Sequence, residues 1–271
     1  MDRSKEASGA VRRAAGFALA VALPIAGAGC AGTGGPPGPG PRGVVALSAW
    51  APALQARAFA EGGSKSTDGS PRVGALGTSA AVLFDRWALT WDSATVFLPT
   101  DPDLSGGAVV AGSSTRYARA CLAAGPKILE VPAAAGEPPG SAARGPPLLR
   151  LDALAGLRVH DLSVVDADLG TGRTIDFRER WADAVAGLRA EGAVVPGVAW
   201  RVQGDSAIGG SGSDHAWRAC AALVLGPSEG FGIALGWEAQ ALDYSRGRGP
   251  DLVRLDMKSL GGPFLALEIR F

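Results

Sequence analysis

One serine and one histidine in the C-terminal half are of the types that nucleophilic catalysis requires. Ser206 ends the run Gly204-Asp205-Ser206, and His215 follows shortly after it. A serine hydroxyl becomes a nucleophile when a histidine takes its proton and an acid orients that histidine. The nearest acid, Asp214, adjoins His215 in sequence and would lie on the opposite face of a strand. The pattern therefore favours a Gly-rich hairpin loop, and we expect neither catalysis nor a cofactor.

The chain has only two histidines and three cysteines, and their spacing does not fit a metal site. His160 shares the strand parity of Arg158, which is typical of a hydrogen-bonded polar residue inside a barrel. Cys121 and Cys220 also fall on the charged parity. A disulfide between them would require neighbouring strands, so we expect free thiols.

Twelve charged residues recur on one parity of the predicted strands. The acids are Asp92, Asp152, Asp183, Asp205, Glu238 and Glu268. The arginines are Arg119, Arg158, Arg189, Arg201, Arg218 and Arg270. A wide pore that selects one ion sign would carry an excess of the opposite sign. A balanced set instead predicts ion pairs that fill a narrow lumen, because unpaired buried charge is costly.

The elements that must position these charges are long strands with a two-residue period. The last segment, 252–271, is the clearest, because Leu265, Leu267 and Ile269 alternate with polar or small residues and Phe271 ends the chain. An apolar face, a charged face and a terminal aromatic residue are typical of the closing strand of a bacterial outer-membrane β-barrel. The fold class that we predict is all-β, an antiparallel up-and-down transmembrane barrel of about ten strands, with eight or twelve as alternatives. The predicted strands are 44–59, 73–84, 87–98, 116–124, 149–162, 181–190, 197–205, 215–225, 231–243 and 252–271.

The connections between these strands also carry information. Segments 61–72, 99–114 and 163–179 read as polar loops at the outer end of the barrel, where longer connections are found. Segment 125–147 is rich in Pro, Gly and Ala and falls where a short inner turn is expected. It is either an insertion on the periplasmic side, or the strand count is wrong by two.

The N-terminus has the pattern of an export signal. Basic residues precede an apolar segment, 14–28, which is short for a transmembrane helix and typical of a signal peptide. Cys30 follows directly, which resembles a lipidation site, while cleavage after Ala28 is the alternative. We expect a signal peptide at 1–29, a Gly/Pro tether at 30–43 and a barrel at 44–271.

The C-terminal half contains a set of motif residues, which are Trp181, Asp183, Gly187, Arg189, Gly204, Asp205, Ser213, Asp214, Trp217, Gly236, Trp237, Asp243, Tyr244, Gly262, Pro263 and Phe271. With these residues the chain resembles a family of uncharacterised bacterial outer-membrane β-barrel proteins. The resemblance implies a barrel, and it carries no established activity or cofactor. The chain departs from the family pattern at Ala184, where the family has proline, and at Arg218 and Glu238, where it has glutamine and arginine.

The last two departures suggest a replacement ion pair. Both residues fall on the inward parity of neighbouring strands. If the turn between the strands is centred on Ser228, Arg218 lies directly opposite Glu238. The next allowed register places Gln240 opposite Arg218 and leaves Glu238 diagonal, still within reach of a long side chain.

We therefore predict a monomeric barrel in the bacterial outer membrane with a narrow, charge-balanced lumen, acting as a structural protein or a restricted pore for small solutes. Its expected partners are outer-membrane lipid and, through the C-terminal strand, the barrel-insertion machinery. The net charge is zero, so no nucleic-acid partner is indicated. The alternatives are a barrel that binds or adheres through its surface loops, a soluble periplasmic β-sandwich lipoprotein, and a membrane-embedded lipid-modifying enzyme.

Overall fold

The computed structural model describes residues 41–60, 63–66, 74–98, 114–132, 147–168, 174–210, 213–226, 230–246 and 253–271. The predicted signal peptide at 1–29, Cys30 with most of the tether, and nearly all of the 99–114 loop lie outside the described residues. No helix among the described residues is long and apolar enough to cross a membrane.

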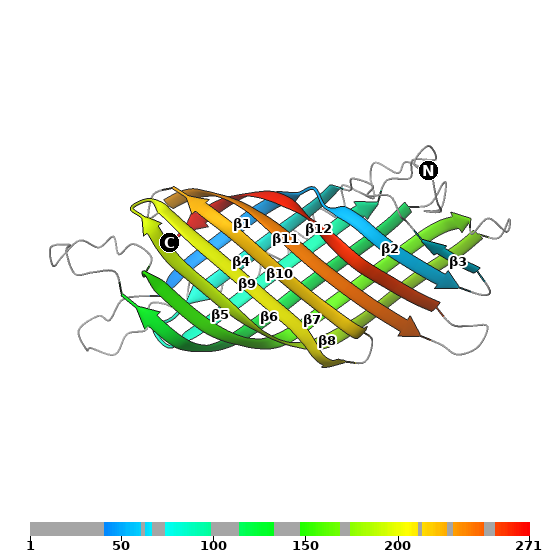
Figure 1. The fold of residues 1–271 in the computed structure, drawn as a ribbon, viewed down its shortest axis with the longest axis horizontal. Helices are drawn as coiled ribbons and strands as arrows, with labels where there is room; N and C mark the ends of the chain where they lie inside the picture. Colours follow the sequence, from blue (N-terminus) through cyan, green and yellow to red (C-terminus); the bar gives the residue numbers. More distant parts are fainter. Residues whose placement is uncertain are drawn as a thin grey trace.

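The strands form one antiparallel sheet that closes on itself as a tilted barrel (Figure 1). They are β1 (Arg42–Trp50), β2 (Ala53–Ala60), β3 (Gly63–Ser66), β4 (Gly74–Leu83), β5 (Trp87–Leu98), β6 (Ser114–Val131), β7 (Leu149–Asp168), β8 (Thr174–Val195), β9 (Val198–Gly210), β10 (Ser213–Leu225), β11 (Gly230–Arg246) and β12 (Val253–Arg270). From β4 to β12 each strand pairs with the next one along the chain, β2 pairs with β3, and β1 pairs with both β4 and β12. The predicted all-β barrel is confirmed, and the closed sheet excludes the β-sandwich alternative.

The barrel has ten strand positions, because its first two strands are each divided in two. β1 and β2 are separated at Ala51 and Pro52, and both pair with β12. β4 pairs with β1 and β3 pairs with β2, each on the side away from β12. A proline has no N–H to donate to a ladder, which accounts for the break at Pro52.

Three strands, β6, β7 and β8, extend well beyond the ends that their sequence patterns predict. β6 continues to Val131, so the first part of the predicted 125–147 insertion is strand. Pro126 is accommodated because its partner on β5 is Trp87, the first residue of that strand. β7 likewise continues to Asp168, and β8 begins at Thr174. Most of the predicted 163–179 loop is therefore paired strand. The ten-strand count leaves the remainder of 125–147 as the connection between β6 and β7.

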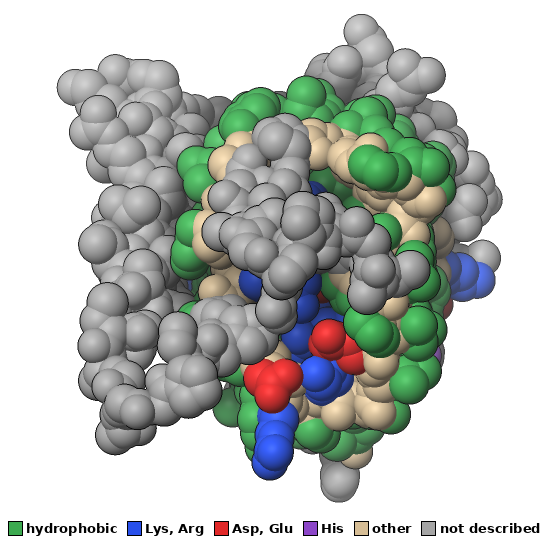
Figure 2. Space-filling view, turned by 90° about the vertical axis from the view of Figure 1, so that its left-hand side faces the viewer, with side chains coloured by type: hydrophobic (Ala, Val, Ile, Leu, Met, Phe, Trp, Pro, Cys, Tyr) green, Lys and Arg blue, Asp and Glu red, His purple; other side chains and the backbone are tan. Residues whose placement is uncertain are grey.

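The two faces of the barrel differ in chemistry. Large apolar side chains on the outside are well exposed, among them Leu157 at 61% and Ile208 at 68%. A view from the end that holds the C-terminus shows hydrophobic side chains around the outside and charged side chains inside (Figure 2). Phe271 exchanges backbone hydrogen bonds with Gly43 at 2.7 and 3.1 Å, and this pair completes the junction of the first and last strands.

Candidate functional site in the barrel lumen

The twelve charged residues predicted on one parity all have their side chains in the lumen. The structure brings them together in two groups. The first, which we call the middle ring, consists of Asp92, Arg119, Arg218 and Glu238, with Arg158 and Asp205 beside it. The second, which we call the end cluster, consists of Asp152, Arg189, Arg201, Glu268 and Arg270 and lies nearer the C-terminus. Asp183 belongs to neither and pairs with His160 instead.

The middle ring crosses the lumen from one wall to the other. Asp92 on β5 and Arg119 on β6 face Arg218 on β10 and Glu238 on β11, about half a turn of the barrel away. Arg119 contacts both carboxylates. Arg218 also contacts both, at 3.1 Å from Nε to Glu238 Oε1 and 3.3 Å from Nη1 to Asp92 Oδ2. Each charge therefore has two partners of opposite sign, in a closed cycle.

The register of β10 and β11 corrects one sequence prediction. Arg218 lies opposite Gln240, and Glu238 lies opposite Cys220, so the direct pairing of Arg218 with Glu238 is wrong. The alternative register is the one observed. The reason is that the pairing of Leu225 with Ile233 centres the turn one residue later than Ser228, which moves the partner of Arg218 by two residues. The ion pair still forms, diagonally, because both side chains are long and share the inward face.

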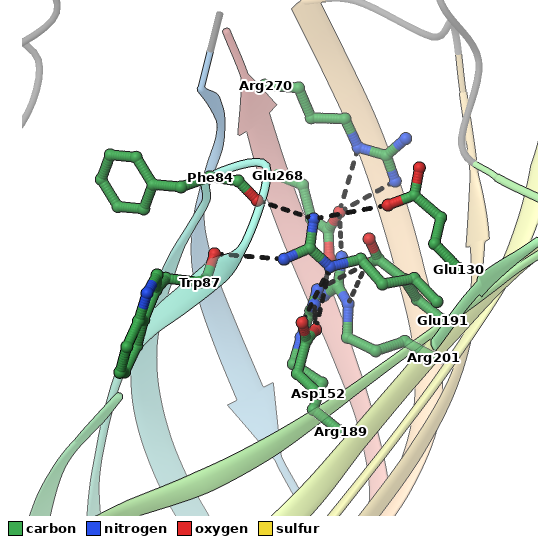
Figure 3. Close-up of polar contacts among 10 residues, drawn as sticks. Phe84, Trp87, Glu130, Asp152, Arg189, Glu191, Arg201, Glu268 and Arg270 are labelled. Atoms are coloured by element: carbon green, nitrogen blue, oxygen red, sulfur yellow. Dashed lines mark hydrogen bonds and ion pairs between the residues drawn. The ribbon is translucent and has the colours of Figure 1, made fainter. Parts of the chain in front are cut away.

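The end cluster joins β7, β8, β9 and β12 (Figure 3). Arg201 Nη1 donates to Glu268 Oε1 at 2.8 Å, and Arg270 Nη2 donates to Glu268 Oε2 at 3.1 Å. Arg189 bridges Glu191 at 2.5 Å and Asp152 at 3.4 Å. Arg201 belongs to the end cluster, whereas Asp205, on the same strand, pairs with Arg158 beside the middle ring.

Sequence reasoning missed two members of the end cluster, Arg150 and Glu191. Arg150 is 1% exposed, contacts Asp152, and donates to the main-chain oxygens of Phe84 and Trp87 at 3.1 Å each. Both residues continue the inward parity, at the start of β7 and beyond the predicted end of β8. Following that parity to the ends of the strands would have found them.

An aromatic layer lies in the lumen on the other side of the middle ring from the end cluster. Tyr117 and His160 Nδ1 are hydrogen-bonded at 2.8 Å, and His160 Nε2 lies 3.1 Å from Asp183. His160 stacks on Trp181, which stacks on Tyr244 of the far wall with ring centroids 4.2 Å apart. His160 is thus a buried polar residue inside the barrel, hydrogen-bonded to Tyr117 and close to Asp183, as its parity suggested.

The described part of the lumen contains a small cavity between the middle ring and the end cluster. This cavity of about 90 Å³ is lined by ring residues such as Arg119 and by end-cluster residues such as Arg201. That volume holds only a few water molecules. Cys121 and Cys220 are free thiols. Ser206 Oγ donates to main-chain oxygens of Ala207 and Ala216 at 3.4 Å, while His215 is exposed on the outer face.

Comparison with known proteins finds distant structural similarity. No family model and no curated protein matches the chain. Neisserial surface protein A is similar over 85% of this chain and 97% of its own, with 12% identity and a TM-score of 0.34. The attachment invasion locus protein Ail of Yersinia pestis covers 85% and 98%, with 13% identity and a TM-score of 0.34. The P. putida toluene transporter TodX covers 88% and 91%, with 8% identity and a TM-score of 0.27. These values transfer no function to this chain.

Proposed function

We propose that this chain is an outer-membrane barrel whose lumen is held shut by paired charges, so that it serves a structural role or passes only small solutes. The observation that carries the proposal is the middle ring, which ties opposite walls together through Asp92, Arg119, Arg218 and Glu238. The end cluster and the aromatic layer add two further barriers.

The outer face of β7 supports the membrane placement. Its outward residues from Leu149 to Val159 are all apolar, and Asp161 follows. Ten residue steps at about 3.3 Å, tilted by about 40°, give a band roughly 25 Å tall. That height matches the apolar band of an outer-membrane barrel. The proposed partners are membrane lipid and, through β12 and Phe271, the machinery that inserts barrels. The proposed oligomeric state is a monomer.

Planar-bilayer recording of the purified protein tests the closed lumen. We expect small or absent conductance from the native chain, because ion pairs and aromatic rings occupy the cross-section of the lumen. Replacing all four ring residues by alanine removes two charges of each sign and should raise conductance several-fold. Asp214→Ala, on the outer face, is the control and should leave conductance unchanged. A large, steady conductance from the native chain would contradict the proposal.

A further inference from the structure

Three arginines form a patch on the outer wall of the barrel, outside the lumen already described. Arg116 of β6 pairs with Ser163 of β7, which pairs with Arg178 of β8, so these residues lie in one row across three strands. In the next row Asp161 pairs with Arg180. We call Arg116, Arg178 and Arg180 the outer arginine patch.

One carboxylate serves all three guanidinium groups. Asp161 accepts from Arg180 Nε at 2.6 Å, and lies 3.5 Å from Arg178 and 3.8 Å from Arg116. The side chains of Arg178 and Arg180 are 60% and 65% exposed. The patch therefore has an excess of two positive charges, with most of its donors directed to the surroundings.

The position of the patch along the barrel axis, relative to the apolar band, indicates which part of the membrane surrounds it. Asp161 is the first polar outward residue of β7 after the apolar band, and Arg180 precedes the small outward residues Ala182 and Ala184 of β8. The patch lies at the end of the barrel opposite Phe271. The short connections between β4 and β5 and between β8 and β9 lie at the Phe271 end, and short turns are periplasmic in outer-membrane barrels. In the proposed membrane placement the patch is therefore at the level of the lipid headgroups of the outer leaflet.

We propose that the outer arginine patch binds a phosphate group of a lipid headgroup in the outer leaflet. The guanidinium fork matches phosphate oxygens in two-point contact, and like charges crowded beside an apolar phase are stabilised by an anion. The inference rests on the proposed membrane placement. At the same end of the barrel β10 and β11 differ from the patch, because they carry Asp214 and Asp243 there.

Native mass spectrometry of the full chain in detergent tests the site, with diphosphoryl lipid A, phosphatidylcholine and inorganic phosphate as probes. Arg116→Gln with Arg178→Gln and Arg180→Gln should lower lipid A occupancy roughly tenfold or more, because each arginine near a lipid surface contributes measurably to binding. Asp161→Asn should raise occupancy, since it removes the competing carboxylate. Phosphatidylcholine, whose headgroup has no net charge, should bind weakly to every variant.

Lys258→Gln is the matched control, because Lys258 is an exposed outward cation on β12, away from the patch. An equal loss in this variant, or native lipid A occupancy in the triple variant, would overturn the site. Displacement of lipid A by an equal concentration of inorganic phosphate would overturn the lipid assignment. Each sample is first shown to be a folded barrel by its gel mobility with and without boiling. A folded triple variant that keeps lipid A refutes the site alone, whereas a chain absent from the membrane fraction refutes the placement.

Discussion

At the scale of single residues, the middle ring is distinguished by its connectivity. Each carboxylate, Asp92 and Glu238, contacts both Arg119 and Arg218. All four side chains are largely buried, and burial of an unpaired charge is costly. Loss of one member therefore leaves the other three with an uncompensated charge, while loss of an opposite pair preserves the balance.

A double-mutant cycle of Arg218→Gln and Glu238→Gln follows from this arrangement. Each single change should lower the free energy of unfolding by about 3 kcal/mol, because it leaves a buried charge unpaired. The double change should cost less than the sum of the two by about 1 kcal/mol or more. Denaturant unfolding in detergent micelles measures all four corners of the cycle.

The control for this cycle combines Arg218→Gln with Asp152→Asn. Asp152 belongs to the end cluster and contacts Arg150 and Arg189, not the ring. The two effects should therefore add to within about 0.5 kcal/mol. Additive effects in the Arg218 and Glu238 cycle itself would contradict the pairing.

At the scale of elements, strand identity and face were predictable, whereas register and strand ends were not. The two-residue period placed β10, β11 and β12 close to their observed bounds, because apolar and charged residues alternate cleanly there, whereas β9 continues to Gly210 beyond its predicted end at 205. Register depends on the length of the turn after Leu225, which composition does not fix. The ends of β6 and β8 were missed because Gly125, Pro126 and charged residues resemble loop sequence, although neighbouring strands continue to pair with them.

Gly156 of β7 gives a prediction about how closely the strands approach. A Cβ atom there would lie 2.1 Å from Leu122 O and 2.6 Å from Ala123 Cα, both backbone atoms of β6. Gly156→Ala should therefore force β6 and β7 apart and cost about 1–3 kcal/mol, seen as a lower melting temperature in detergent. Gly204→Ala is the control, since its nearest contact is an ordinary 3.6 Å from Arg218 O. Equal melting temperatures for the two variants would contradict the close approach.

The outer face of β7 gives a second prediction at this scale. Leu157 is outward and 61% exposed, four residues below Asp161 in the apolar band. Leu157→Arg should destabilise the barrel in lipid bilayers by about 2 kcal/mol, because an arginine between the midplane and the edge of the apolar band still loses hydration. His215→Arg, on the outer face of β10 beyond the band, should cost about 1 kcal/mol or less. Equal costs for the two, measured by unfolding from vesicles, would argue against a spanning β7.

At the scale of the whole molecule, everything depends on the junction of β1 with β12. The charges of the lumen can meet across the barrel only if the sheet is closed. Seven consecutive residues of β1, from Val44 to Trp50, pair with β12, and Trp50 Nε1 donates to Gly262 O at 3.0 Å. The junction joins segments that are far apart in the sequence, which makes it the place to test closure.

Cysteine pairs introduced across the junction should form disulfides. Ser48 pairs with Ala266, and Ala49 pairs with Leu265. Paired residues of antiparallel strands have Cα atoms about 4.5–5.5 Å apart, within the range that a disulfide spans. Successive residue pairs along two antiparallel strands alternate between hydrogen-bonded and non-hydrogen-bonded pairs, and the side chains are closer in the second kind. One of these two adjacent cysteine pairs is of that kind, so we expect one of them to oxidise readily. The linked, unfolded chain is a large loop and should run faster on a non-reducing gel.

A hairpin pair provides the standard for this experiment. Thr78 Oγ1 and Ser93 Oγ lie 2.8 Å apart on β4 and β5, so Thr78→Cys with Ser93→Cys should link whether or not the barrel closes. Ser48→Cys alone shows any reaction with the native cysteines, Cys30, Cys121 and Cys220. If the hairpin pair links and neither junction pair does, the sheet is open in solution. In that case the middle ring could not hold its opposite walls together, and the closed lumen would fail with it.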